Sequence, residues 1–268
     1  MRNSTNTGKN RLRLRTVLQP GSVIVLGLII WQVAVKLTGI EPWLLPAPSG
    51  VLESLWNSRS LVGFHASYTL LETILGFALA VVVGIAIAFF MDLSPGARRT
   101  IYPLLVISQT VPLIAIAPLF MLWFGLGLLP KVYVIALVCF FPISVSLSDG
   151  FQSVDQEWLK LMTTMDASKW QVYKYVKWPA ALPSFFSGLR IAATYSVMGA
   201  VIAEWMGGNR GLGILLSRSS ASFLTAQVFA TILTIVILSL LVFSFIELLA
   251  RLTMKWYYHQ LREDKPTK

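Results

Sequence analysis

The sequence predicts an all-α protein that crosses a membrane about six times, and three observations support this fold class. First, 56% of its 268 residues are hydrophobic and only 13% are charged, whereas soluble domains carry about a quarter charged residues. Second, apolar runs of about 18 or more residues recur, the length that a helix needs to cross the hydrocarbon core. Third, Lys and Arg are distributed unevenly between alternate connections. Because backbone groups in lipid must be satisfied within their own segment, the apolar runs are predicted to be helices.

The apolar runs divide the chain into a basic arm over residues 1–19, a transmembrane domain over 20–250 and a basic tail over 251–268. A hydrophilic stretch over residues 153–179 interrupts the transmembrane domain. The predicted spans are 20–39, 66–91, 101–124, 131–149, 181–204 and 226–250. The first apolar run is interpreted as an uncleaved span, because it exceeds a signal-peptide core and no small-residue cleavage site follows it.

The basic residues predict how these spans are oriented. If the N-terminus is cytoplasmic, sixteen Lys and Arg residues fall on the cytoplasmic side and five on the other, with Arg190 inside a span. Cytoplasmic connections carry an excess of Lys and Arg, so both termini are predicted to be cytoplasmic. The net charge of +10 is therefore a topology signal, and no nucleic-acid partner is expected.

The sequence offers little for catalysis or metal binding. Cys139 is the only cysteine, so an intramolecular disulfide or a cysteine-based metal site is excluded. His65 and His259 lack ligand spacing and are expected at an interface or in solvent. HExxH and GxSxG motifs are absent, and TGKN at 7–10 lacks the first glycine and the Ser/Thr of a phosphate-binding loop. No cofactor, metal or catalytic residue is predicted.

The hydrophilic stretch over 153–179 has the pattern of two short amphipathic helices. Ser153 with Gln156, and Ser168 with Gln171, are capping-box pairs. Apolar side chains then recur at helical spacing, and Pro179 is expected to limit the second helix. The apolar positions are Trp158, Leu161, Met162 and Met165 in the first helix, and Trp170, Tyr173 and Val176 in the second. Two interpretations stay open: a hairpin lying on lipid headgroups, or a docking element for a partner protein.

The same stretch resembles the cytoplasmic loop of ABC-type importer permeases. That loop reads Glu-Ala-Ala, three residues, Gly, nine residues, Ile-x-Leu-Pro, and its spacing from Asp166 to Pro179 is kept here. Lys160 replaces the acidic residue, and Asp166 replaces the glycine. Further stretches are similar to the nitrate/sulfonate/taurine branch, among them VPLIAIAPLFMLWFGLG and IAEWMGGNRGLGILL, so the resemblance covers residues 44–250.

The resemblance implies a type I ABC importer permease fold and a division of labour between subunits. Two permease copies form a translocation path, two ATPase subunits grip the loops, and an extracytoplasmic binding protein delivers the solute. The chain is expected in the inner membrane of a bacterium. The loop residues implied to couple to the ATPase are Lys160, Leu161, Met162, Met165, Asp166, Ala167, Ser168, Trp170, Tyr173 and Pro179.

Three other residues are candidates for the substrate path, since ionisable side chains within spans are often functional. Arg190 lies in the fifth span and could instead extend to headgroups or bond helix carbonyls. Glu204, followed by Trp205, could face the outer cavity or pair with Arg210. Residues 40–62 are expected to form a short helix along the outer interface.

The leading hypothesis is a permease subunit of an ATP-driven importer. A stand-alone secondary transporter or channel is the alternative, although inverted-repeat spacing and intramembrane charges for ion coupling are scarce. The sequence also lacks the motifs that an intramembrane enzyme would need. The sequence leaves nitrate, sulfonates, taurine, bicarbonate and a heterocyclic vitamin precursor open as cargo.

Overall fold

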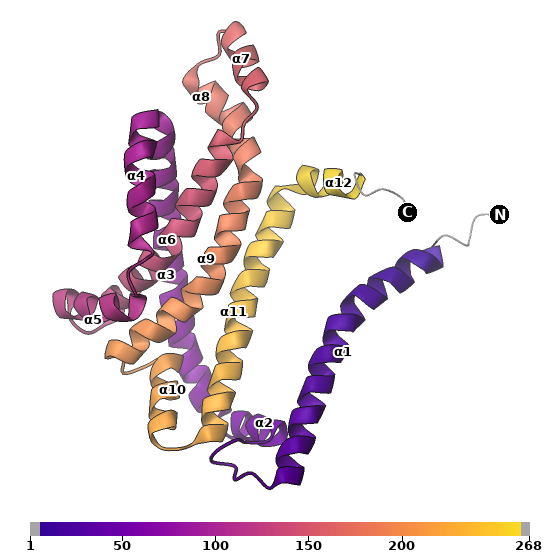
Figure 1. Ribbon diagram of the computed structural model, residues 1–268. Coiled ribbons are helices and arrows are strands. Elements are labelled where there is room, and N and C mark those ends of the chain that lie inside the picture. The colour runs from indigo at the N-terminus through magenta and orange to yellow at the C-terminus, as the bar shows by residue number, and fades with distance from the viewer. Residues whose placement is uncertain (1–5, 264–268) are drawn as a thin grey trace.

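The computed structural model describes residues 6–263, and the side chains of residues 21–259. Every regular element in this part of the chain is a helix (Figure 1). The long helices are α1 (Asn6–Thr38), α3 (Arg59–Leu93), α6 (Leu128–Gln152), α9 (Trp178–Gly207) and α11 (Thr225–Thr253). The short ones are α2 (Pro48–Asn57), α4 (Pro95–Ser108), α5 (Leu113–Phe124), α7 (Gln156–Thr164), α8 (Lys169–Val172), the π-helical turn η1 (Tyr173–Lys177), α10 (Leu212–Ala221) and α12 (Lys255–Glu263).

Five of the predicted spans correspond to the long helices. Five helices in the described part are long and apolar enough to cross a membrane, or six if the bent pair of α4 and α5 counts as one span. The predicted basic arm supplies the beginning of α1, with residues 1–5 outside the described region. The predicted basic tail supplies α12, with residues 264–268 outside it.

The predicted span over residues 101–124 is not one continuous helix, because α4 and α5 meet at an angle of 97°. Pro112 stands at the N-cap of α5 with an extended ψ of 122° and cannot donate a backbone hydrogen bond. A residue that precedes proline is also pushed out of the helical region, so the chain turns over residues 109–112. The apolar run was long enough for one span, but length alone does not reveal this break.

The core of the bundle lies where α3, α6 and α9 contact one another. Buried Ala80, Ile135, Leu147 and Ala192 belong to one cluster there. A Cβ added at Gly188 of α9 would lie 2.5 Å from the Pro142 carbonyl oxygen of α6. Small residues thus let the backbones approach closely, as at helix interfaces in membranes. These three helices form the most closely associated part of the molecule.

The other helices surround this core and define its two ends. We call the end with α7 and α8 the hairpin end, and the end with α2 and α10 the α10 end (Figure 1). Helix α2 confirms the short helix expected within residues 40–62, and it packs against α1 and α11. Helix α1 diverges from α11 toward the hairpin end (Figure 1). Only 6% of the residues in its apolar part, Gly21–Thr38, are buried.

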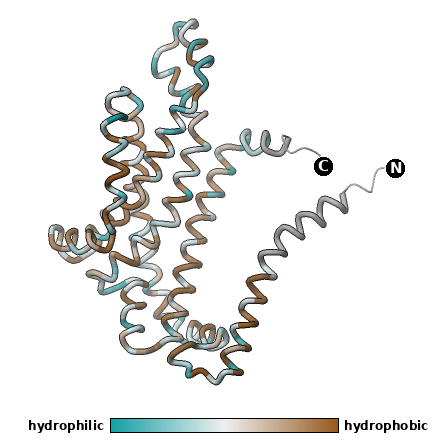
Figure 2. Tube along the Cα trace, in the orientation of Figure 1, coloured by the Kyte–Doolittle hydropathy of each residue, from teal (hydrophilic) through white to brown (hydrophobic). Residues whose placement is uncertain are grey.

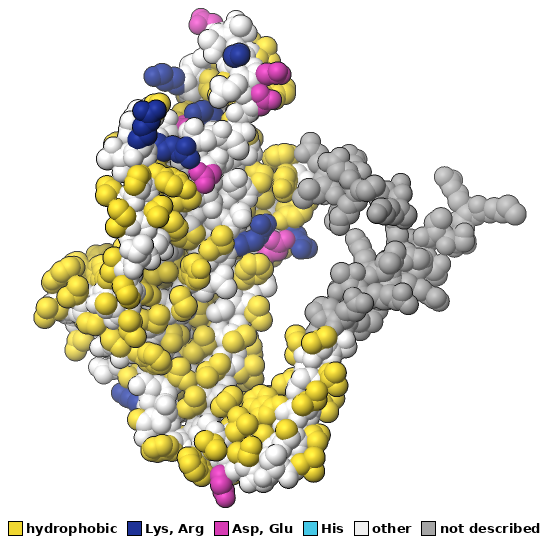
Figure 3. Space-filling model, viewed as in Figure 1, with side chains coloured by type: hydrophobic (Ala, Val, Ile, Leu, Met, Phe, Trp, Pro, Cys, Tyr) yellow, Lys and Arg dark blue, Asp and Glu magenta, His cyan; other side chains and the backbone are white. Residues whose placement is uncertain are grey.

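The surface between the two ends is largely apolar. Val82, Leu122 and Leu241 are 67%, 78% and 60% exposed, and hydrophobic residues dominate the middle of the bundle (Figure 2). Lys and Arg gather instead toward the hairpin end in the view of Figure 3. An apolar band with basic residues beyond one edge is the distribution expected of a multi-pass membrane protein.

Candidate functional site

The hairpin of residues 153–179 begins with α7, whose start differs from the predicted one. Asp155 is the N-cap, and its carboxylate accepts a hydrogen bond from a first-turn N–H at 2.9 Å. The predicted capping box of Ser153 and Gln156 is therefore wrong. Ser153 ends α6, and its hydroxyl donates to the Gly150 carbonyl at 2.9 Å. Ser and Asp are both good N-caps, so the sequence does not say which one lies at the boundary.

The turn between α7 and α8 explains how Asp166 takes the place of a glycine. Asp166 has a φ of +54°, the left-handed region in which Asp and Asn are tolerated after Gly. Its N–H donates to the Thr163 carbonyl at 3.1 Å, and the Ala167 N–H donates to the Met162 carbonyl at 3.0 Å. These are the two hydrogen bonds of a Schellman motif, which requires a left-handed residue at this position. The turn geometry therefore survives the loss of glycine.

The second helix of the hairpin confirms one predicted feature and overturns another. The capping box of Ser168 and Gln171 is present with both of its hydrogen bonds. Pro179 does not end the helix, because α8 continues through η1 into α9. Within η1 the Trp178 N–H donates to the Tyr173 carbonyl, five residues back. This widened turn changes the hydrogen-bonding register just before the proline, and π-helical turns of this kind frequently occur at functional sites.

The two faces of the hairpin differ in what they contact. The side chains of Leu161, Met165 and Trp170 are exposed, Trp170 by 73%. Tyr173 points the other way, and its ring lies 5.4 Å from that of Phe89 of α3 in a tilted arrangement. The predicted coupling residues on the hairpin away from its base are exposed or half-buried, and they are Lys160, Leu161, Met162, Met165, Asp166, Ala167, Ser168 and Trp170. Tyr173 and Pro179 lie at the base, half-buried.

A buried carboxylate that the sequence analysis did not single out holds this base. The side chain of Asp92, at the end of α3, is only 1% exposed. It accepts hydrogen bonds from the Lys177 ammonium at 2.6 Å, the Gln152 amide at 3.1 Å and the Tyr173 hydroxyl. Asp92 therefore joins the ends of α3 and α6 to η1. The sequence shows only a lone Asp after an apolar run, which gives no sign of these three donors.

Arg190, a candidate for the substrate path, is engaged with neighbouring helices. Its guanidinium donates to Glu247 of α11 at 2.8 Å and to the Tyr258 hydroxyl of α12 at 2.9 Å. Glu247 also accepts from Arg251, one turn later in α11, at 2.7 Å. The arginine thus ties α9 to α11 and α12.

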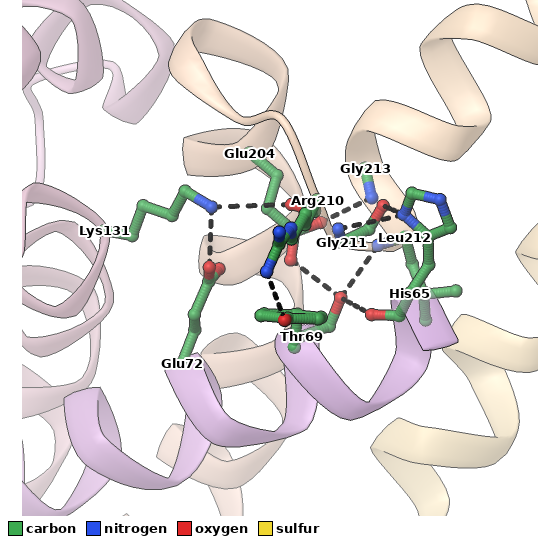
Figure 4. Close-up of polar contacts among 10 residues, drawn as sticks. His65, Thr69, Glu72, Lys131, Glu204, Arg210, Gly211, Leu212 and Gly213 are labelled. Carbon is green, nitrogen blue, oxygen red and sulfur yellow. Dashed lines mark hydrogen bonds and ion pairs between the residues drawn. The ribbon is translucent and has the colours of Figure 1, made fainter. Parts of the chain in front are cut away.

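Glu204, the other ionisable candidate, is fully buried at the α10 end, where its carboxyl group points toward Thr69 and the start of α10 (Figure 4). Its carboxylate accepts hydrogen bonds from the Thr69 hydroxyl at 2.7 Å and from the Gly213 N–H. The alternative pairing with Arg210 is wrong, since the Arg210 guanidinium donates to Tyr68 instead. Trp205, next in the chain, is 43% exposed.

Together with two side chains of α3, Glu204 caps the first turn of α10. The Gly211 N–H contacts His65 Nδ1 at 3.0 Å, and the Leu212 N–H donates to the Thr69 hydroxyl oxygen at 2.8 Å. Gly211 has a φ of +115°, and a Cβ there would overlap the Glu204 carboxylate, so this position requires glycine. A carboxylate at a helix N-terminus is also favoured by the helix dipole. The expectation that His65 lies at an interface or in solvent is wrong, because it is buried against this loop.

An ion pair lies beside this cap (Figure 4). Lys131 of α6 is 5% exposed and donates to Glu72 of α3 at 2.6 Å. The Lys131 ammonium also donates to the Arg210 carbonyl, at 3.5 Å, in the loop that precedes α10. The cap and the ion pair form one buried polar cluster, which we call the α10-end cluster: His65, Thr69, Glu72, Lys131 and Glu204.

Comparisons with known proteins agree with this architecture. Residues 80–255 match the family described as binding-protein-dependent transport system inner membrane component. The chain is 39% identical over 240 residues to the formylaminopyrimidine transport permease protein ThiX of Halalkalibacterium halodurans, covering 89% of this chain and 96% of that one. It is 33% identical to the riboflavin transport system permease protein RibX of Chloroflexus aurantiacus, covering 87% and 88%. It is 32% identical to the taurine transport system permease protein TauC of Escherichia coli, covering 92% of each.

Solved structures share the fold at lower identity. A chain of an amino acid ABC transporter superposes with a TM-score of 0.58 at 16% identity, covering 75% of this chain and 96% of that one. A chain of the MetNI methionine ABC transporter, in an inward-facing conformation, gives 0.55 at 17% identity, covering 77% and 97%. The match over residues 80–255 and the relatives above 30% identity therefore establish that this chain belongs to the binding-protein-dependent transport system inner membrane components, the permease subunits of ABC importers.

Proposed function

We propose that the hairpin is the surface through which a separate ATP-binding subunit drives this permease. The observation that carries the proposal is an exposed apolar face on a hairpin whose ends and turn are well defined by hydrogen bonds. Trp158, Met165 and Trp170 are 59%, 69% and 73% exposed there. Exposed Trp residues are typical anchors of protein interfaces, and truncating such an anchor removes about 2 kcal/mol or more of binding free energy.

The direction of the hairpin favours a protein partner over lipid headgroups. A helix that lies on a membrane presents its long side to the interface. Here α8 continues the direction of α9 beyond the apolar band, so the hairpin projects away from the bundle (Figure 1). A groove of about 460 Å³ runs along its base, lined among others by Trp158, Tyr175 and Trp256. This groove offers a concave apolar surface beside the exposed face.

The proposed assembly follows from this contact. Two copies of the chain form the translocation path, each gripped by one ATP-binding subunit, and a binding protein delivers solute at the α10 end. The hairpin and both chain termini then lie in the cytoplasm of a bacterium, with the transmembrane domain in its inner membrane. The excess of Lys and Arg toward the hairpin end supports this orientation.

For the cargo we propose a small heterocycle of the formylaminopyrimidine type. The 39% identity to a permease named for that solute supports this choice. Within the described spans, the least exposed cations are each paired with a carboxylate, Lys131 and Lys177 at 2.6 Å and Arg190 at 2.8 Å. A small anion such as nitrate or taurine sulfonate would have to compete with these carboxylates. An uncharged heterocycle would not.

Reconstitution tests the proposal. The permease, its ATP-binding subunit and its binding protein are placed in liposomes loaded with ATP, and uptake of labelled formylaminopyrimidine, taurine and nitrate is compared. Uptake of the pyrimidine that requires ATP is expected. Uptake that persists without the ATP-binding subunit would instead support a stand-alone transporter, and ATP-dependent uptake of taurine alone would overturn the cargo assignment.

A further inference from the structure

A single helical rod connects the hairpin with the α10-end cluster. Helices α8, η1 and α9 form one span candidate of 39 residues, Lys169–Gly207. At about 1.5 Å per residue such a rod is about 58 Å long. Trp170 lies on its first turn and Glu204 on its last. A displacement of the hairpin therefore acts on the same rod that carries Glu204.

Helix α10 is attached to the far end of this rod by hydrogen bonds that it cannot replace. Its N-cap, Gly211, has no side chain, so the N–H groups of its first turn depend on acceptors from α3 and α9. Thr69 receives Leu212 N–H at 2.8 Å and itself donates to Glu204 at 2.7 Å, while Glu204 receives Gly213 N–H. These groups are buried, and each buried donor left without an acceptor costs about 1–3 kcal/mol.

The cost of breaking these hydrogen bonds determines whether α10 follows the rod when the rod moves. Separating α10 and Thr69 from Glu204 would leave the buried Gly213 N–H without its acceptor and the Thr69 hydroxyl without Glu204, at a total of about 2 kcal/mol or more. Keeping α10 with Glu204 preserves these hydrogen bonds, and what must adjust is the apolar packing of α10 against Val62 of α3 and Leu238 of α11, together with its exposed C-terminal turn. That turn carries Phe223 with a φ of +55° and 73% exposure, followed by exposed Leu224. Helix α10 is therefore expected to follow the rod.

We infer that Glu204 and Thr69 are positioning residues that carry the movement of the hairpin to α10, so that ATP-driven motion reaches the surface at the opposite end. The inference rests on the proposed function of the hairpin. It assigns Glu204 a role in coupling rather than in contact with the solute. Neither residue touches the exposed hairpin face, so a defect in either should leave attachment of the ATP-binding subunit intact.

Two threonines of α3 provide a matched test. Thr69 and Thr73 lie one turn apart, both with 0% exposure. The Thr69 hydroxyl joins α10 to Glu204, whereas the Thr73 hydroxyl has no hydrogen-bond partner among the described residues. Thr69→Val and Thr73→Val remove the same atom type from equally buried sites. Only the first change breaks the attachment of α10.

The measurement is the amount of solute taken up per ATP hydrolysed in the reconstituted complex. Thr69→Val is expected to lower this ratio at least fivefold while the ATP-binding subunit stays bound, and Thr73→Val is expected to leave it unchanged. Thr69→Ser, which restores the hydroxyl, is expected to restore the ratio. An unchanged ratio in Thr69→Val, or an equal fall in both valine variants, overturns the inference.

A second variant covers the case in which Thr69→Val does not fold, which would show as rapid labelling of the buried Cys139 thiol. Glu204→Gln keeps the shape and one acceptor oxygen but removes the second, so the ratio is expected to fall in the same direction. A wild-type ratio in Glu204→Gln overturns the inference. If the wild-type complex shows no ATP-dependent uptake at all, the proposed function itself fails, which is a different result.

Discussion

The two ends of the α8–α9 rod expose and bury opposite kinds of side chains. At the hairpin end, apolar side chains such as Trp170 are exposed, while the backbone around them is fixed by caps and by the turn at Asp166. At the α10 end, charged and polar side chains such as Glu204 and Lys131 are buried and paired. The backbone of the first region is defined mainly by local hydrogen bonds and its apolar side chains point to the outside, whereas the side chains of the second region pair with one another. Substitutions should therefore mainly affect binding of the ATP-binding subunit at the first end, and stability or coupling at the second.

The largest expected effect lies at the α10 end, in Lys131→Met. Removing the ammonium leaves the Glu72 carboxylate buried without its ion pair, which destabilises a protein by about 3–5 kcal/mol. The buried Cys139, the only cysteine of the chain, reports on this, because a thiol-reactive dye labels it only when the bundle opens. Labelling should become faster by more than a hundredfold. The double variant Lys131→Met/Glu72→Gln should recover most of the loss, and an unrecovered double variant would argue against the ion pair as the cause.

A smaller effect is expected at the base of the hairpin, from Asp92→Asn. The change removes the charge that receives Lys177 at 2.6 Å, and hydrogen bonds to charged groups contribute about 1.5–3 kcal/mol. Limited trypsin digestion within the hairpin should become about tenfold faster or more, with Cys139 labelling changed far less. The matched control is Asp149→Asn, whose partner Arg98 lies at the surface, and it should be nearly silent. Equal effects of the two changes would contradict an anchoring role for Asp92.

The smallest effect is expected at the turn, in Asp166→Val. A β-branched residue at a φ of +54° is strained by about 1–2 kcal/mol, whereas Asp166→Gly relieves the strain that Asp itself carries. Valine should therefore weaken retention of the ATP-binding subunit about tenfold, and glycine should preserve or improve it. A valine variant that binds like the glycine variant would show that the left-handed turn does not matter for the contact.

The sequence predicted more of the hairpin end than of the α10 end, for a physical reason. Caps, turns and apolar spacing act between residues a few positions apart, so the pattern around Ser168 and the glycine position at Asp166 could be recognised locally. The tertiary cap joins His65 and Thr69 to Gly211 and Leu212, about 140 residues away, and no local pattern encodes it. The same limit applies to Asp92, whose donors come from two other helices.

Two local predictions failed because the same local signal is compatible with more than one structure. Ser153 and Asp155 are both good helix caps, and only three-dimensional context selects the second. Pro112 and Pro179 both disfavour a continuous helix, yet only at Pro112 does the helix break. Before Pro179 a π-helical turn changes the hydrogen-bonding register, and the helix continues. Tyr173 begins this π-helical turn, and its side chain faces Asp92 instead of the exposed face of the hairpin. A Tyr173→Asp variant would therefore test the base of the hairpin and not the docking surface.

The most direct test compares Trp170→Ala with Trp56→Ala, because these side chains are 73% and 69% exposed at opposite ends of the molecule. Each variant is purified in detergent after co-expression with the ATP-binding subunit, and the amount of that subunit retained is measured. Trp170→Ala is expected to lose at least nine-tenths of it, as the removal of an interface anchor worth about 2 kcal/mol implies, while Cys139 stays protected and Trp56→Ala retains it fully. Equal retention by the two variants would contradict the claim that the hairpin is where the ATP-binding subunit attaches.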